Sequence, residues 1–220
     1  MAVSNFIPSS RVMQPGVCTS TTRPASPFTG MVIYETDTNR TMVWQGSAWV
    51  MLTDADTPPA SQLVKVQTIG TNVGSVTVTN AFSSEFDSYQ ITVTGGSCGG
   101  DYGLNMTLGS TTSGYYYAGF YLTYAGTNPF NLNGNNAAFW GATGIATTNT
   151  LSANIFVNNP YLAKHTYFSA PYVYGSGAGG HGANAGYLAN TNQYTDFTLA
   201  ISASGMTGGT IRVYGFRNTI

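Results

Sequence analysis

The sequence predicts an all-β protein, because two of its features indicate strands and a third argues against helices. Apolar and polar residues alternate over residues 89–94 and 197–202, which is the pattern of a strand with one buried face. Clusters of Gly, Asn, Ser and Thr separate such runs and supply turns. No stretch repeats its apolar residues with the 3.6-residue period of a capped helix. We therefore expect an antiparallel sandwich or jelly roll.

The region after residue 62 carries most of the predicted strands. Its strand-like runs cover residues 64–69, 75–79, 89–94, 104–108, 115–124, 151–157, 166–174, 196–202 and 210–216. A chain of 220 residues is long enough for one substantial β domain with a smaller appendage. We assign residues 63–220 to a jelly-roll-like sandwich and call this part the head.

Residues 1–29 are predicted to form an extended arm. They contain four prolines, at positions 8, 15, 24 and 27. Proline fixes φ and disfavours helix in the residue before it. An extended arm has no core of its own, so it needs a neighbouring molecule to lie on.

Residues 30–52 are predicted to form a small β meander, with strands at 31–36, 41–44 and 49–52. Three short strands are not stable alone. We expect Tyr34, Trp44 and Trp49 to form one aromatic cluster that packs on a partner; the alternative is a self-contained subdomain. Residues 53–62, with the Pro58-Pro59 pair, are predicted to be a stiff linker.

The composition limits the partners. Only 7% of residues are charged, whereas 42% are hydrophobic and 13% aromatic, and the formal net charge is −1. The seven basic residues are scattered, so no basic stripe is present to neutralise the phosphates of a nucleic acid. The sequence contains no run of about 18 apolar residues, which a membrane-spanning helix would need. A surface with so little charge resists association poorly, which favours a subunit of an assembly.

Motifs for catalysis or cofactor binding are weak. Residues 175–180 match the G-x-G-x-x-G dinucleotide pattern, but a poor helix start follows them. Asp54 and Asp56 open like a calcium loop but lack its glycine. His165 and His181 have no metal-ligand spacing, and no G-x-S-x-G elbow is present. The sequence therefore predicts no enzyme, no cofactor and no metal site.

Two aromatic stretches, residues 114–121 and 136–140, stand out in a chain rich in Asn, Gly and Ser. Tyrosines among small polar residues are typical of contact surfaces, because they supply large area for little lost entropy. The alternative is that alternate rings fill the sandwich and the others pack between subunits. The candidates for ligand or inter-subunit contact are Tyr115, Tyr116, Tyr117, Phe139 and Trp140.

Residues 22–40, with the sequence TRPASPFTGMVIYETDTNR, and residues 43–50, VWQGSAWV, resemble a segment of tailed-bacteriophage virion proteins. Such proteins include tail fibres, minor tail proteins, head fibres and capsid decoration proteins. Residues 210–217, TIRVYGFR, resemble the last strand of the sandwich heads that follow this segment. The resemblance implies a virion subunit, assembled in the host cytoplasm as a homotrimer, with an arm that docks to other virion proteins.

Three functions compete on this basis. The first is a short tail-fibre or tail-tip subunit whose head contacts a host surface receptor. The second is a capsid decoration or head-fibre protein that stabilises the phage head. The third, an enzyme that cuts host polysaccharide, needs two carboxylates flanking the bond, and most of the carboxylates in this sequence lie in predicted turns.

Overall fold

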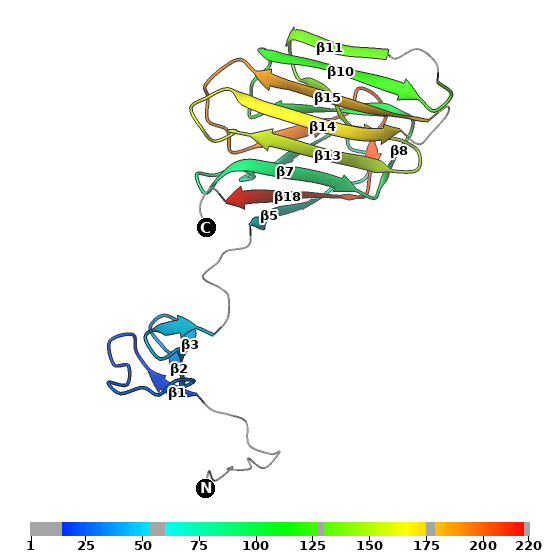
Figure 1. Cartoon of the computed structure of the whole chain (residues 1–220). Coiled ribbons are helices and arrows are strands. Elements are labelled where there is room, and N and C mark those ends of the chain that lie inside the picture. Colours follow the sequence, from blue (N-terminus) through cyan, green and yellow to red (C-terminus); the bar gives the residue numbers. More distant parts are fainter. Residues whose placement is uncertain (1–14, 53–59, 127–129, 175–178, 218–220) are drawn as a thin grey trace. The chain divides into compact units, whose positions relative to one another are not determined.

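The computed structural model describes residues 15–52, 60–126, 130–174 and 179–217. Within these ranges every regular element is a β-strand, which confirms the predicted all-β class. The chain divides into two compact units, Met1–Pro58 and Pro59–Ile220, shown in Figure 1. We call the first the small unit; the second is the head.

The small unit is a four-stranded sheet in the order β1-β2-β3-β4. Its strands are β1 (Gly16–Cys18), β2 (Val32–Glu35), β3 (Arg40–Trp44) and β4 (Trp49–Met51). The last three form the predicted antiparallel meander. The turn between β2 and β3 places Asn39 at φ 56°, a conformation that asparagine tolerates better than most residues.

Strand β1 corrects the predicted arm. It pairs in parallel with β2, with Gly16 opposite Ile33, so residues 16–18 complete the sheet instead of extending away from it. Proline content indicates extended backbone but does not tell a free arm from a strand followed by a loop. Residues 1–14 of the arm and 53–59 of the linker lie outside the described residues, and β5 of the head begins at Ser61.

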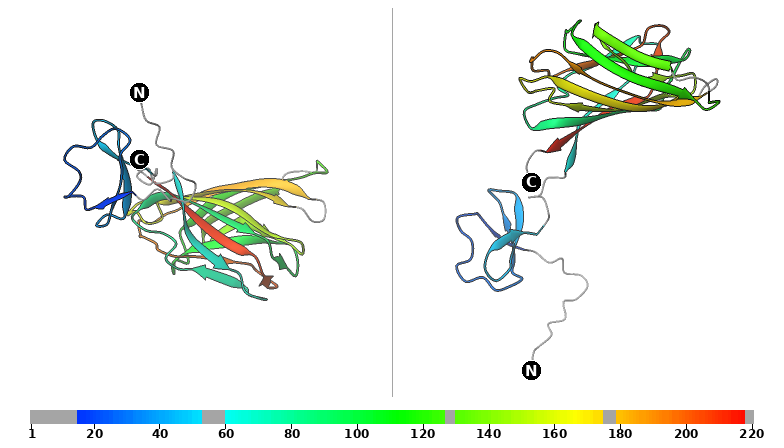
Figure 2. Two further views of the ribbon diagram at one scale, coloured as in Figure 1. Left: turned by 90° about the horizontal axis from the view of Figure 1, so that it is seen from below. Right: turned by 45° about the horizontal axis from the view of Figure 1, so that its top comes forward.

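The head is a sandwich of a larger and a smaller antiparallel layer, which Figure 2 shows from two further directions. The larger layer has the order β5-β18-β7-β13-β14-β15-β10-β11, and the smaller layer has the order β6-β16-β9-β12. The two layers are continuous where β12 pairs with β13. The larger layer contains β5 (Ser61–Thr68), β18 (Thr210–Arg217), β7 (Phe86–Thr94), β13 (Leu151–Asn158), β14 (Thr166–Tyr174), β15 (Gly180–Leu188), β10 (Tyr115–Thr123) and β11 (Phe130–Ala137). The smaller contains β6 (Ser75–Val78), β16 (Phe197–Ala200), β9 (Tyr102–Leu108) and β12 (Trp140–Ala146).

The strand order confirms a jelly roll. Taken along the chain, the eight framework strands are β5, β6, β7, β9, β12, β13, β16 and β18. They lie in the spatial orders first-eighth-third-sixth and second-seventh-fourth-fifth, which is the double Greek key of this fold. A two-stranded ribbon of β8 (Ser97–Cys98) and β17 (Met206–Thr207) lies outside the two layers.

Two inserted hairpins enlarge one layer. The hairpin β10-β11 follows β9, the hairpin β14-β15 follows β13, and β10 pairs with β15 over nine residue pairs. The four strands therefore continue the larger layer beyond β13, as the upper part of Figure 1 shows. We call these four strands the extension.

Five strands of the head as described were not predicted from the sequence. Two are the two-residue strands β8 and β17. The others are β11, β12 and β15, which are rich in Gly, Ala and Asn. Such residues have low strand propensity, and residues 181–186 were described only as a poor helix start, whereas they lie in strand β15. Their small side chains are used for packing, because inward-facing glycines leave room for rings of the adjacent strands.

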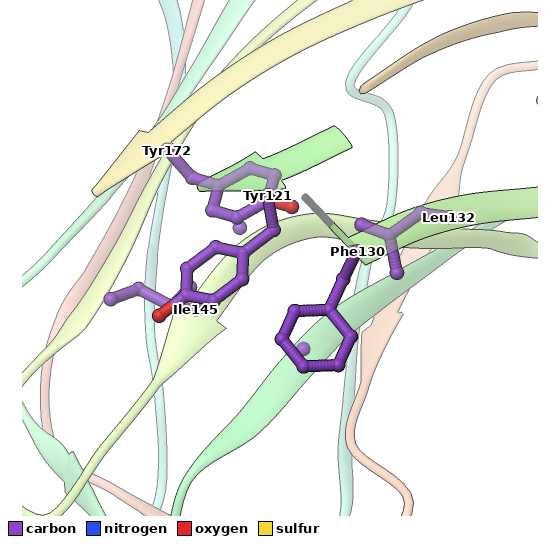
Figure 3. A pocket seen from close by; sticks show the side chains of 8 residues that line it. Tyr121, Phe130, Leu132, Ile145 and Tyr172 are labelled. Carbon is purple, nitrogen blue, oxygen red and sulfur yellow. The ribbon is translucent and has the colours of Figure 1, made fainter. Parts of the chain in front are cut away.

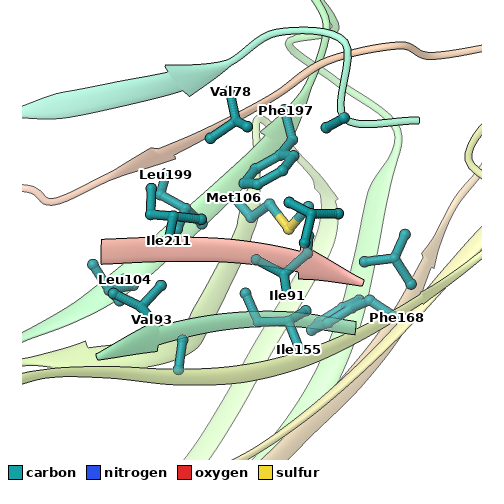
Figure 4. Packing of buried hydrophobic residues seen from close by; sticks show 14 of the residues in the cluster. Val78, Ile91, Val93, Leu104, Met106, Ile155, Phe168, Phe197, Leu199 and Ile211 are labelled. Atoms are coloured by element: carbon teal, nitrogen blue, oxygen red, sulfur yellow. The ribbon is translucent and has the colours of Figure 1, made fainter. Parts of the chain in front are cut away.

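The core lies between the two layers, as Figure 4 shows. The smaller layer contributes Val78, Met106 and Leu199, and the larger layer contributes Ile91 and Ile211, all at most 1% exposed. Along β7 and β9, buried residues alternate with more exposed ones. The alternation of apolar and polar residues in the sequence therefore matches the alternation of burial in the strands.

Candidate contact surface

Tyr115 lies in the core, and its predicted contact role is wrong. It is fully buried, and its hydroxyl accepts a hydrogen bond from Leu108 N at 2.8 Å and donates one to Thr111 O at 3.2 Å. Burial raises the pKa of Tyr115 to about 12. These bonds satisfy a hydroxyl that would otherwise be costly to bury.

Trp140 is also a core residue, so its predicted contact role is wrong too. It is 0% exposed and packs edge-on against Tyr115 at 5.2 Å and beside Phe168 at 4.6 Å between ring centroids. Its Nε1 donates to Tyr187 O at 3.3 Å. Phe139, the preceding residue, is 38% exposed.

Tyr116 and Tyr117 point to opposite faces of β10, as neighbours in a strand must. The Tyr117 ring lies on the inner face, where a Cβ at Gly134 would approach it to 2.2 Å and one at Gly141 would approach its hydroxyl to 2.6 Å. Glycine at these positions is required by the close approach of the ring. Tyr116 lies on the outer face and remains a contact candidate.

The outer face of the extension carries a row of rings that we call the tyrosine ridge. Tyr116 stacks on Tyr187 with centroids 5.1 Å apart and planes 10° apart. The ring centroid of Tyr167 lies 6.1 Å from that of Tyr187. The His165 ring stacks on the Tyr187 ring, with centroids 5.6 Å apart. The rings come from β10, β15 and β14 and from the turn before β14, so only the folded sheet brings them together.

Beside the tyrosine ridge lies a floor of small residues that we call the small-residue trough. The pairing places Ala118 opposite Ala185 and Ala185 opposite Ser169, and the next row contains Ala183 and Pro171. Two hollows, of about 280 and 540 Å³, both have Ala118 and Ala185 in their lining, so they adjoin. Together their linings include residues of β11, β10, β15 and β14.

A second ridge of apolar residues borders the trough on its other side. Phe120, Leu122 and Val173 are 41%, 43% and 56% exposed. His181 pairs between Leu122 and Val173, with its ring edge-on to Phe120 at 6.3 Å. Within the extension as described, no strand contains Asp, Glu, Lys or Arg. The described strands of this face therefore carry no Asp, Glu, Lys or Arg, and Lys164 is exposed in the turn before β14.

A separate hollow of about 380 Å³ lies between the extension and the smaller layer, and Figure 3 shows its side chains. It is lined mainly by Tyr121, Phe130, Leu132, Ile145 and Tyr172. Both tyrosine hydroxyls donate to backbone, Tyr121 to Gly179 O at 3.0 Å and Tyr172 to Phe120 O at 3.4 Å. Burial raises the pKa of Tyr172 to about 12. The walls are thus apolar, with both hydroxyls already bonded.

The small unit separates its three predicted contact residues. Trp44 pairs with Trp49, and their ring centroids are 5.5 Å apart. Tyr34 pairs with Thr41, three positions from Trp44 on β3, so it lies on the opposite face of the sheet. Its hydroxyl donates to Asn39 Oδ1 at 3.1 Å. The prediction of one cluster of three rings is wrong.

The Tyr34 face of the small unit is open and apolar. Val17, which pairs with Tyr34, is 63% exposed, and Val50, which pairs with Val43, is 40% exposed. The other face holds the buried Ile33 and Glu35. The unit is therefore one sheet with one covered and one uncovered apolar face.

An ion pair connects the loop after β1 to the covered face. Arg23 Nε donates to Glu35 Oε1 at 2.5 Å, and Thr38 Oγ1 donates to Oε2 at 2.8 Å. The hydrogen bond from Arg23 holds the pKa of Glu35 below its usual range, although burial opposes it. Hydrogen bonds from Ser20 likewise lower the pKa of Asp37.

We expect acid to destabilise the small unit through these two carboxyl groups. Their folded pKa values are lowered, so their contribution is present above the unfolded values of about 4 and is lost as the pH falls through the folded values. Urea titrations at about pH 6 and about pH 3, followed by the amide NMR signals of β2, measure this. Glu35→Gln should show a smaller decrease, whereas Glu85→Gln in the head should behave like the parent. An equal decrease in both variants would contradict this assignment.

The motifs considered for chemistry do not assemble into a site. Gly180 begins strand β15, so the described end of the glycine motif leads into a strand and not a helix; residues 54–56 lie outside the described residues. In the described part of the chain, no group of three or more His, Cys, Asp or Glu could hold a metal ion. No helix among the described residues is long and apolar enough to span a membrane.

The outer face of the extension is the best-formed candidate for contact, since it combines exposed rings with two adjoining hollows. Sequence analysis found Tyr116 but missed Tyr167 and Tyr187. Comparison of the chain with models of protein families, with curated proteins and with solved structures found no match. What the chain does is therefore inferred from its own residues and surfaces.

Proposed function

We propose that this chain is a non-enzymatic surface protein of a tailed-bacteriophage particle, whose head contacts the host as a short tail-fibre or tail-tip subunit. The observation that carries this proposal is the outer face of the extension, with rings that are exposed or half-buried and no charged residue in its described strands. Such a face binds by burying ring area, at little entropic cost and without desolvating charges. The likeness of residues 22–50 to virion segments supports its place on a particle.

The small unit fits the attachment end of such a subunit. Its open face, with Val17 and Val50 exposed beside the half-buried Tyr34, offers apolar area to another virion protein or to further copies of this chain. Burying such area contributes about 25 cal/mol per Å². The homotrimer implied by the resemblance would use this face without any covalent step.

Immunogold labelling of intact particles of the phage that encodes this chain tests the proposal. Antibodies against the full chain are expected to label the end of the tail. Label confined to the capsid would replace the tail-fibre role by the alternative, a decoration or head-fibre protein, and purified particles without any label would end the virion assignment.

Competition for adsorption tests host contact directly. The purified full chain, added in excess, is expected to slow adsorption of the phage to its host. The same chain with Tyr187→Ala should compete less, whereas Thr77→Leu, a change at an exposed position of the smaller layer, should compete as well as the parent. Unchanged adsorption in excess parent protein would contradict the tail-tip role.

A further inference from the structure

We infer that strand β11 is a docking edge for a second copy of this chain, with the two β11 strands antiparallel around a two-fold axis at Leu132. The inference goes beyond the proposed function and does not depend on where a particle carries the protein. The contact joins two copies, or two larger assemblies, and so differs from the three-fold association that the resemblance implies.

The sheet of the described head ends at three strands, β5, β6 and β11, each of which pairs along one edge only. Proteins protect such edges with charged residues, bulges or short strands. β5 carries Lys65 and a register shift between Leu63 and Lys65, and β6 is four residues long. β11 has eight residues without Asp, Glu, Lys, Arg or Pro, and Figure 1 shows it at the border of the sheet. No described strand uses its far edge, so another strand can pair there.

The regular part of β11 selects the register of this pairing. The strand pairs with β10 without a break from Phe130 to Gly134, and a bulge follows, where Asn136 has φ 55°. A bulge disrupts the ladder on its strand, so residues 130–134 are the stretch that a partner strand can follow. An antiparallel copy uses the whole stretch only when Leu132 lies opposite its own copy.

The inner face of β11 complements itself in this register. Phe130 of each copy lies opposite Gly134 of the other. The Phe130 side chain is 63% exposed, whereas the Tyr117 ring occupies the place where a Cβ of Gly134 would lie. An aromatic side chain opposite an edge glycine covers it. Phe130 of one copy therefore packs over Gly134 and beside Tyr117 of the other.

Apolar surface at the same edge stabilises the pair. Phe130 and Leu132 line the hollow of about 380 Å³ between the layers, and Figure 3 shows both side chains. The two Leu132 side chains meet at the axis and bury area that one copy leaves open. On the outer face, the exposed Asn131 lies opposite the exposed Asn133 of the other copy, and each amide both donates and accepts. The strand thus matches its own sequence, which favours a second copy over another chain.

Sedimentation of the full chain over about 1 µM to 1 mM tests the pairing. The parent is expected to gain mass with concentration, toward a doubled value. Leu132→Lys places like charges opposite each other at the axis and should keep the unpaired mass throughout. Leu63→Lys makes the same change on β5, where Leu63 is 48% exposed, and should behave like the parent. A parent that keeps the mass of Leu132→Lys would overturn the inference, and this is also the result expected if the edge binds a different protein.

A disulfide trap tests the register and does not depend on the tolerance of the fold for lysine. In a Cys18→Ser background, which leaves the buried Cys98, Leu132→Cys should form a disulfide between copies in air. Residues directly opposite on antiparallel strands have Cα atoms about 4.5–5.5 Å apart, within the reach of a disulfide. Asn135→Cys should stay reduced, because its copy lies about 20 Å away in this register. Equal cross-linking of the two variants, or none in either, would overturn the two-fold pairing at Leu132.

Discussion

Replacement of Trp140 by alanine is expected to lower the free energy of unfolding of the head by about 3–5 kcal/mol. The indole is the largest fully buried side chain of the core and contacts the rings of Tyr115 and Phe168. Its removal leaves a cavity and also leaves Tyr187 O without the indole donor. The loss is expected on the extension side of the head, where β10, β12 and β14 meet around this ring.

Urea unfolding at equilibrium measures this effect, and Phe139→Ala is its matched control. Phe139 is the adjacent aromatic residue but is 38% exposed, so its truncation should cost much less, at most about 1 kcal/mol. Equal losses for the two variants would show that Trp140 is not packed as described.

Substitution of Gly186 by alanine is expected to cost about 1–3 kcal/mol, the usual range for overpacking. A Cβ at this position would lie 2.0 Å from Tyr116 O and 2.7 Å from Tyr117 Cα. Both atoms belong to the backbone of the neighbouring strand β10, so β10 and β15 would have to separate. The extension is expected to lose its pairing before the framework of the jelly roll does.

Gly74→Ala is the control, because a Cβ there meets no atom within 4 Å. This change should be neutral or slightly stabilising, since alanine restricts the unfolded chain. Hydrogen exchange of the amides of β10 and β15 identifies where the structure opens. Faster exchange confined to β5 and β18 in the Gly186 variant would contradict the close approach.

Much of the fold could be predicted because apolar residues alternate wherever one face of a strand is buried. The run from Tyr89 to Val93 is an example, with three buried apolar side chains at alternate positions. Strand β15, with the sequence GHGANAGYL, could not be recognised in this way. Its inward positions include glycines that accommodate rings from β10 and β14. The apolar residues that fill this part of the core therefore belong to the neighbouring strands and not to β15. Propensity describes one residue at a time and does not register this pairing.

The candidate site was only partly predictable for a related reason. Alternation shows that Tyr115 and Tyr116 face opposite sides, but it does not show which side is the core. Residues 136–140 combine the end of one strand, a turn and the start of another, so no period indicated that Trp140 is buried. Tyr167 and Tyr187 join Tyr116 only through the order of β10, β15 and β14. In the small unit, Tyr34 pairs with Thr41, which is three residues from Trp44. Residues an odd number apart on a strand face opposite sides, so this spacing could have indicated that Tyr34 and Trp44 lie on different faces.

The pairing of β5 with β18 places Ser61 opposite Phe216, so the backbone enters and leaves the head at one corner. A domain whose two ends lie close together is readily inserted into another protein, because both of its connections are made at one place. The head should therefore be exchangeable as a cassette. Recombination that replaces this segment would exchange the outer face of the extension and leave the small unit unaltered.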